Sequence, residues 1–469
     1  MRIYNTLSGQ LEEFKPRKKD KIQLFVCGPT VYDYIHIGNA RTFVFFDVVA
    51  KYLRHKKYDV DYIQNITDID DKIIAKAKEK NCTVKECAGE FEKAFMEDMA
   101  ALGVTAPRYK SATDYIPRII GQVKRLKDKG HAYLIEGDGW YFNVKTFPEY
   151  GKLSGRTAQM AEDGVSRIDE SEKKRNKADF CLWKLSKPEE PTWPDAELGN
   201  GRPGWHIEDT AITETEFGPQ YDIHGGGQDL LFPHHEAELT QQESASPPPQ
   251  GEQFVNYWMH VAFLINKSAK MAKSAGNFTT VRDLLKEYSP EAIRFYLLSA
   301  HYRSPLDFNE NSLKMAEAAV QRIAEFRSRL GAIQTAHTKN KNLKYEVREY
   351  VEKINVSLDN DFDTTAAFRI FFDFIRKMHR LIDEQRVDAD AVAASVAMLN
   401  FVDKLFGFLA MSAPVPIKIR GLVRQREAAR SAKNFTKSDE LRKEIESIGY
   451  SIDDTAYGPL VKKQRVTGK

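Results

Sequence analysis

The chain has 469 residues, 42% hydrophobic and 29% charged, which is a composition typical of globular proteins. At roughly 100–200 residues per domain, this length predicts about three domains. No run approaches the ~18–20 apolar residues of a membrane span, and residues 1–5 lack the apolar stretch of a secretory signal peptide. Four scattered cysteines, Cys27, Cys82, Cys87 and Cys181, exclude a disulfide framework. These features predict a cytoplasmic protein.

The first predicted elements form a strand–helix–strand unit. Residues 22–27 are short, apolar and β-prone, and a Gly-Pro pair then indicates a turn. Apolar residues recur at helical spacing over about 38–55, and residues 59–66 are again β-prone. This order predicts a doubly wound, Rossmann-like parallel α/β sheet. Ligands bind beyond the carboxyl ends of the strands in such sheets, so residues 27–39 are expected at the site.

The remaining chain divides where its composition changes. Helical patterns alternate with loops from about residue 67, and turn-forming residues 199–204 begin a second α/β block. After Pro290 the sequence is mostly helical, and prolines near residue 415 precede a short basic helical domain. We predict a split α/β domain (1–115 and 199–265), an insertion (116–198) and a loop with following helices (266–340). A helical bundle (341–412) and a small basic domain (413–469) complete the chain.

The C-terminal residues are basic. Residues 418–469 contain 13 lysines and arginines against 7 aspartates and glutamates, whereas the net charge of the whole chain is only +3. This distribution fits a polyanion held partly by the C-terminus, and it equally fits a solvated helical surface.

The tetrapeptide His36-Ile37-Gly38-Asn39 lies between the first predicted strand and its helix. A helix N-terminus presents unpaired N–H groups and a partial positive charge, so it accepts phosphate. An imidazole there can stabilise charge that develops on phosphate oxygens. A single histidine beside a glycine is nevertheless more often structural.

A second basic motif, Lys270-Met271-Ala272-Lys273-Ser274, follows the second α/β block. Two lysines in a loop of small residues could neutralise a triphosphate. Taken alone, the motif is also what a solvated basic loop looks like.

The two motifs together resemble the paired nucleotide signatures of class I aminoacyl-tRNA synthetases. Asn39 and Ala272 depart from the usual family residues, whereas His36, Gly38 and Lys273 are retained. The resemblance implies catalytic roles for His36, Lys270 and Lys273. It also implies that Mg²⁺ accompanies the ATP. The residues implied to contact ATP are His36, Gly38, Asn39, Gly225, Gly227, Asp229 and Lys273.

Further motifs resemble the cysteinyl-tRNA synthetase family over nearly the whole chain, at residues 27–33, 65–72, 204–208, 222–229 and 232–238. The resemblance implies that ATP activates L-cysteine to cysteinyl-adenylate, which is then transferred to tRNA(Cys). It also implies cysteine contacts from Cys27, Gly28, Thr30 and Trp205, although ordinary core packing is the alternative for Trp205.

The family's zinc ligands correspond to Cys27, position 209, His234 and Glu238. His234 and Glu238 have an i, i+4 spacing, which puts both on one helix face. Position 209 carries Asp209 where the family usually has a second cysteine. Carboxylate, thiolate and imidazole are all zinc ligands, so the expected site is Cys27, Asp209, His234 and Glu238. The alternative is that Asp209 makes only hydrogen bonds and the metal is weak or absent.

The basic C-terminal segment resembles the family's anticodon-binding module, which implies tRNA contacts from Arg424, Arg430, Lys433 and Arg442. A monomer is expected. Two alternatives share parts of these motifs: a ligase that joins cysteine to an amino sugar, and an inactive paralogue that only binds RNA. The C-terminal helical and basic segments disfavour the first, and the two phosphate motifs disfavour the second.

Overall fold

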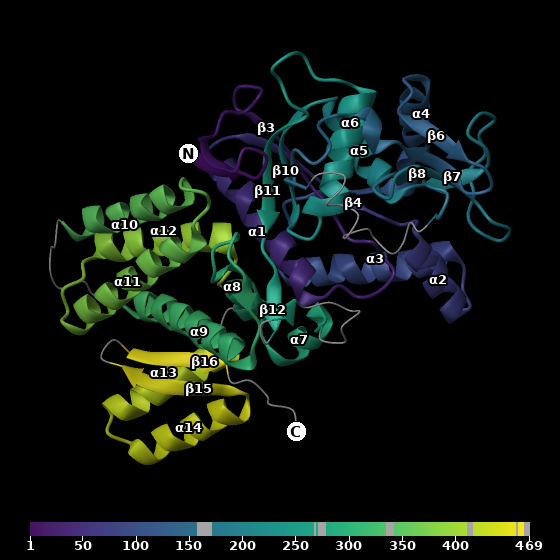
Figure 1. The fold of residues 1–469 in the computed structure, drawn as a ribbon. Coiled ribbons are helices and arrows are strands. Elements are labelled where there is room, and N and C mark those ends of the chain that lie inside the picture. Colours follow the sequence, from purple (N-terminus) through teal and green to yellow (C-terminus); the bar gives the residue numbers. More distant parts are fainter. Residues whose placement is uncertain are drawn as a thin grey trace. The chain divides into compact units, whose positions relative to one another are not determined.

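The computed structural model describes residues 1–156, 171–266, 269–270, 278–333, 342–409, 416–455 and 458–463. These residues form two compact units (Figure 1). The first contains Met1–Pro290, Leu297–Asn309 and Leu358–Thr364, and the second contains Glu291–Tyr296, Glu310–Ser357 and Thr365–Lys469. Among the described helices, none is long and apolar enough to cross a membrane.

The first unit is built on a five-stranded sheet with the order β11-β10-β3-β4-β5, in which every neighbouring pair is parallel. Its strands are β3 (Lys21–Val26), β4 (Asp59–Ile66), β5 (Arg108–Ser111), β10 (Tyr221–Gly227) and β11 (Val255–Val261). The predicted strand–helix–strand unit is confirmed as β3, α1 (Ile37–His55) and β4. Because the chain continues from β3 to β4 while β10 lies on the other side of β3, the order reverses between β3 and β10. Ligand sites are typical of that position.

Helices cover both faces of this sheet. One face carries a large apolar core in which Phe25 and Ile63 pack with side chains of α4 (Ile116–Asp128), α5 (Trp205–Phe217) and α6 (Glu236–Ala245). On the other face α1 packs so closely that a Cβ on Gly225 would lie 2.2 Å from the Phe46 ring. The predicted doubly wound α/β class is therefore confirmed.

The insertion between the two halves of the sheet contains strands that the sequence did not indicate. A four-stranded antiparallel sheet has the order β6-β7-β8-β9. Its strands are β6 (Ala132–Ile135), β7 (Gly139–Phe142), β8 (Phe180–Leu185) and β9 (Gly201–Pro203). Each is short, and β7 pairs with a strand almost forty residues away, so local periodicity carries little signal for them.

The other elements of the first unit lie around these sheets (Figure 1). They are β1 (Arg2–Asn5), β2 (Gln10–Glu13), α2 (Asp71–Lys80), α3 (Val84–Ala101), η1 (Ala112–Tyr115), η2 (Val144–Thr146), η4 (Leu231–His235), β12 (Leu264–Asn266), β13 (Ala269–Lys270), α7 (Val281–Glu287) and β14 (Leu306–Asp307).

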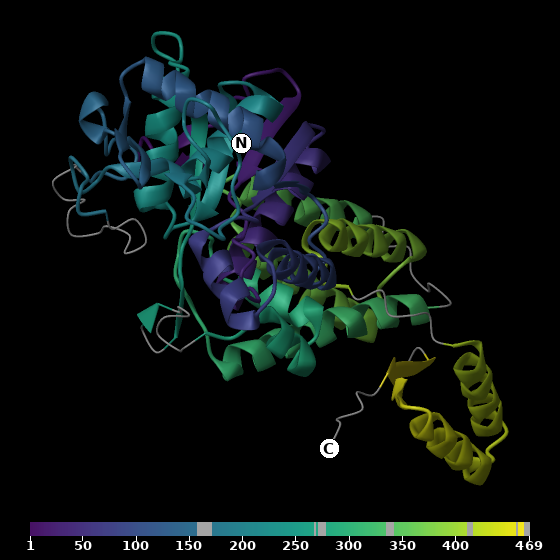
Figure 2. The ribbon, with the colours of Figure 1, turned by 90° about the vertical axis from the view of Figure 1, so that its right-hand side faces the viewer.

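The second unit is mostly helical, as predicted after Pro290. Its helices are α8 (Pro290–Leu298, of which Glu291–Tyr296 belong here), α9 (Glu310–Ala332), α10 (Leu343–Leu358), α11 (Thr364–Asp383), α12 (Ala389–Phe406), α13 (Ile417–Ser431) and α14 (Phe435–Ser447). The last two helices and a hairpin of β15 (Tyr450–Thr455) and β16 (Gly458–Lys463) form a small C-terminal module, drawn in yellow in Figure 2. The sequence predicted the helices of this module but not its hairpin.

Candidate active site and metal centre

A cavity of about 440 Å³ lies beyond the carboxyl ends of β3 and β10. The residues that sequence reasoning singled out around it come from the β3–α1 connection, the end of β10 and the start of α5. Nine of them line the cavity: Cys27, Gly28, Thr30, His36, Gly38, Asn39, Trp205, Gly227 and Asp229. Gly225 does not line it, because this glycine faces Phe46 within the sheet. Lys273 lies outside the described residues, and Lys270 is described only by its backbone pairing with Ile265.

One end of the cavity is the N-terminus of α1. His36 is the N-cap residue, and its Nδ1 accepts a hydrogen bond from the Asn39 backbone N–H at 3.2 Å. No acidic side chain occupies the first turn of this helix, which is described throughout. A Cβ on Gly38 would lie 2.8 Å from the His36 ring, so a larger residue there would displace the imidazole. This end therefore combines a helix N-terminus, an imidazole and close backbone access, which are features of a phosphate site.

Two further glycines keep the cavity open. A Cβ on Gly227 would lie 2.4 Å from Oδ1 of Asp229 and would displace that carboxylate. A Cβ on Gly28 would lie 1.7 Å from the backbone oxygen of Asn65, because the chain after β3 passes directly beside the end of β4. The Gly28 N–H donates to the Asn65 side chain at 2.5 Å. Close approach of the backbone therefore requires glycine at position 28, whereas a side chain at position 227 would push the Asp229 carboxylate aside.

The opposite end of the cavity leads from Cys27 to a buried cluster. Ligand atoms of Cys27, Asp209, His234 and Glu238 all lie within 4.8 Å of one another. Nε2 of His234 is 3.0 Å from a carboxylate oxygen of Asp209 and 3.0 Å from one of Glu238. Sγ of Cys27 is 3.7 Å from Glu238. The four side chains expected to bind zinc therefore lie together in the fold.

The chemistry of these four side chains fits a cation. All are buried, and Oδ1 of Asp209 and Oε2 of Glu238 accept no hydrogen bond from any described residue. Burial, followed by the charges of Glu238 and Asp209, raises the pKa of the Cys27 thiol. Burial and the charge of Asp209 likewise raise the pKa of Glu238. A divalent ion would satisfy the orphaned oxygens and favour the thiolate.

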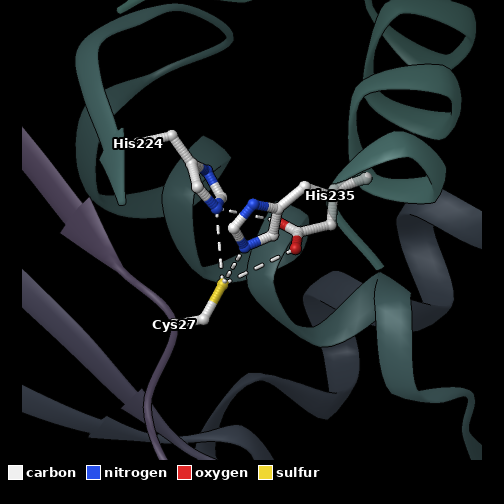
Figure 3. A group of neighbouring side chains, drawn as sticks. Cys27, His224 and His235 are labelled. Atoms are coloured by element: carbon white, nitrogen blue, oxygen red, sulfur yellow. Dashed lines mark hydrogen bonds and ion pairs between the residues drawn. The ribbon is translucent and has the colours of Figure 1, made fainter. Parts of the chain in front are cut away.

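Two histidines beside this cluster were not assigned a role from the sequence, although both lie in the motifs that carried the resemblance. His224 and His235 point their Nε2 atoms at the sulfur of Cys27, at 3.3 and 3.1 Å (Figure 3). With Cys27 and Glu238 they form a second group whose ligand atoms lie within 4.8 Å of one another. Burial lowers the pKa of both imidazoles well below the usual value for histidine, which favours their neutral form.

The proposed ligands are held by outer contacts. Nδ1 of His234 is 2.8 Å from Nδ1 of His206, whose backbone oxygen accepts from the Gln241 amide. Asp209 follows Trp205 by one turn of α5, so both side chains are on one helix face. Histidine ligands usually carry such a second partner, which orients the ring.

The residues expected to bind tRNA lie in the C-terminal module. Arg424 on α13 and Lys433 after it are exposed. Arg430 forms an ion pair with Asp454, and Arg442 donates to the backbone oxygen of Ile452 at 2.8 Å. Arg424 and Lys433 thus lie at the surface, whereas Arg430 and Arg442 also tie their helices to β15.

Comparison with known proteins identifies the family of the chain. Residues 13–318 match the family model described as the class I (C) tRNA synthetase catalytic domain. The chain is 43% identical to the cysteine–tRNA ligase of Trichlorobacter lovleyi and 41% identical to that of Syntrophotalea carbinolica, and each match covers 98% of this chain and 99% of the relative.

The fold also resembles a Mycobacterium tuberculosis methionyl-tRNA synthetase solved in complex with methionyl-adenylate. The TM-score is 0.60 at 13% identity, over 82% of this chain and 92% of that one, which is a likeness of fold alone. The near-complete match to the curated relatives, together with the matching catalytic-domain model, assigns this chain to the cysteine–tRNA ligase family of class I aminoacyl-tRNA synthetases.

Proposed function

We propose that the chain activates L-cysteine with ATP and transfers it to the 3′ end of tRNA(Cys). In the first step the cysteine carboxylate attacks the α-phosphorus of ATP, which gives cysteinyl-adenylate and pyrophosphate. The terminal ribose hydroxyl of the tRNA then attacks the adenylate and releases AMP. One observation carries this proposal: a single cavity is lined both by the N-terminus of α1 and by Cys27, which belongs to the buried cluster.

The nucleotide would bind at the α1 end of the cavity. The His36 imidazole and the N-terminus of α1 would stabilise negative charge as it develops on the phosphates, and Lys270 and Lys273 would neutralise the triphosphate. Gly38 and Asn39 would admit the phosphates, Gly227 would admit the nucleoside, and Asp229 would accept from a ribose hydroxyl. Gly225 would act indirectly, by letting α1 pack against β10. Mg²⁺ would enter with ATP.

The cysteine side chain would bind at the other end, enclosed by Gly28, Thr30 and Trp205. Zinc would be held by Cys27, Asp209, His234 and Glu238, whose donor atoms suit it. A zinc ion binds a thiolate far more strongly than a hydroxyl, which would separate cysteine from serine. The chain's own residues bring the carboxylate and phosphate together, so catalysis rests on positioning and charge stabilisation.

The tRNA would bind in part through the helical bundle and the basic C-terminal module. Exposed Arg424 and Lys433 suit phosphates, and a monomer supplies both the cavity and the module in one chain.

Aminoacylation of tRNA(Cys) with radiolabelled cysteine tests the proposal on the full chain. We expect ATP-dependent charging of tRNA(Cys) and no ATP-dependent labelling of an amino sugar. Labelling of the amino sugar without tRNA charging would overturn the tRNA step. Absence of both, together with tRNA binding, would identify the chain as an RNA binder.

A further inference from the structure

His224 and His235 each point a ring nitrogen at the sulfur of Cys27. Their Nε2 atoms lie 3.3 and 3.1 Å from Sγ of Cys27, which are shorter distances than the 3.7 Å from that sulfur to Glu238 (Figure 3). Nε2 of His224 is 3.6 Å from a carboxylate oxygen of Glu238. Zinc–ligand bonds of about 2.0–2.3 Å in a tetrahedron imply edges of roughly 3.3–3.8 Å between ligand atoms. Most of the distances in this group are close to those edges.

The other ring nitrogens of these two histidines have partners of their own. Nδ1 of His224 is 2.6 Å from the hydroxyl of Tyr221. Nδ1 of His235 is 2.8 Å from Nε2 of His260, whose Nδ1 in turn is 2.8 Å from Oγ1 of Thr6. When Nδ1 carries the proton, Nε2 presents its lone pair toward Cys27. Ligating histidines in proteins are held in this way.

The second group needs no ligand from Asp209. Cys27 and Glu238 would supply two anionic ligands, and His224 and His235 two imidazoles, all from buried side chains. In the second arrangement Asp209 keeps its 3.0 Å hydrogen bond with Nε2 of His234.

We propose that His224 and His235 form, with Cys27 and Glu238, a second metal-binding position beside the one that includes Asp209 and His234. The two positions share Cys27 and Glu238, so one ion occupies one of them at a time. The first position adjoins the cavity wall at Trp205, whereas the second lies toward Tyr221 and His260. The second position would retain the ion when the first position loses its Asp209 ligand. The inference rests on the proposed function only for the presence of an ion.

Asp209→Asn in the full chain tests this proposal, because it removes one carboxylate ligand at nearly constant volume. Zinc content is measured after purification, and X-ray absorption at the zinc edge counts the imidazole ligands. We expect Asp209→Asn to retain stoichiometric zinc with two imidazoles. Loss of the zinc, or zinc with a single imidazole, would overturn the proposal. His131→Gln, which changes a histidine distant in sequence from both ligand groups, is the matched control and should behave as the unchanged chain.

A double variant tests whether His235 binds the metal directly or only makes a hydrogen bond outside the metal site. Adding His235→Gln to Asp209→Asn removes one ligand of the second position, and zinc affinity is measured by competition with a chelator. Loss of an outer hydrogen bond lowers metal affinity by roughly 10–100-fold. We expect a drop of more than about 100-fold, and a smaller drop would contradict the proposal. Circular dichroism of each variant verifies that it folds.

These results are independent of the proposed function. Two imidazoles on the zinc of Asp209→Asn would support the second position even in a chain that does not charge tRNA. Cysteine charging by a chain that binds no zinc would leave the proposed function standing and remove this inference.

Discussion

The indole of Trp205 stacks on the imidazole of His234, with ring centroids 4.2 Å apart and planes 21° from parallel. Trp205 begins α5 and lines the cavity, whereas His234 belongs to the buried cluster. The stack therefore joins the wall of the cavity to a proposed metal ligand. Trp205 can in this way both line the cavity and hold the His234 ring in place.

Replacing Trp205 by alanine should weaken cysteine binding without affecting ATP. An aromatic stack contributes about 0.5–1.5 kcal/mol beyond buried area, so KM for cysteine should rise by roughly 2- to 13-fold. Trp205→Phe keeps a stacking ring and should retain most of the affinity. The two KM values are measured separately by pyrophosphate exchange. An equal rise in KM for ATP would contradict this assignment of Trp205.

Gly38→Ala should impair the phosphate end of the cavity. Its Cβ would lie 2.8 Å from the His36 ring, so the imidazole must move. We expect a lower kcat for exchange with little loss of thermal stability. Gly121→Ala in α4 is the control, since nothing lies within 4 Å of its Cβ and alanine favours a helix by up to about 1 kcal/mol. An unchanged kcat in Gly38→Ala would argue against His36 as a phosphate contact.

Arg424→Ala and Lys433→Ala should each weaken tRNA binding through a lost phosphate contact. The slope of log affinity against log salt concentration should fall by roughly 1 per residue, while exchange without tRNA stays unchanged. Arg426 is the contrast, because it is 2% exposed and donates twice to Asp454 at 2.8 Å. Arg426→Ala should instead unfold the C-terminal module. An unchanged slope of log affinity against log salt concentration would mean that the tRNA phosphates do not contact these two residues.

Acidification should loosen the C-terminal module at Asp454. Hydrogen bonds from Arg426 and then Arg430 lower the pKa of Asp454 to about 2. Because this folded-state pKa is below the ordinary value of about 3.9, the pair stabilises the module above about pH 4 and that contribution is lost as the pH falls toward 2. The side chain is 36% exposed, so screening limits the effect to about 1 kcal/mol or less.

Asp454→Asn provides the comparison for this pH dependence. Hydrogen-exchange protection of α13 and α14 should be lower in the variant than in the unchanged chain near pH 7, and the two should converge near pH 2. A difference that persists at low pH would mean that the contact does not depend on the charge of Asp454.

Local sequence predicted the elements whose signal is local. The apolar run at residues 22–27 became β3, and the i, i+4 spacing of His234 and Glu238 brought their side chains to 3.0 Å. The roles of His224 and His235 could not be obtained in this way. His224 faces Cys27 because β3 pairs with β10, and that pairing joins segments almost 200 residues apart. His235 reaches the same sulfur from η4. The hairpin after α14 was missed for a different reason, because β15 contains Asp453-Asp454 and β16 begins with Gly458-Pro459, which are residue types depleted in strands.

Amino-acid-dependent ATP–pyrophosphate exchange tests most directly whether this cavity activates cysteine. Cysteine and serine are compared side by side on the full chain, with zinc content measured on the same preparation. We predict exchange that depends on cysteine, is negligible with serine, and accompanies bound zinc. Equal exchange with serine would contradict thiol selection by the Cys27 cluster, and no exchange with cysteine would contradict the account as a whole.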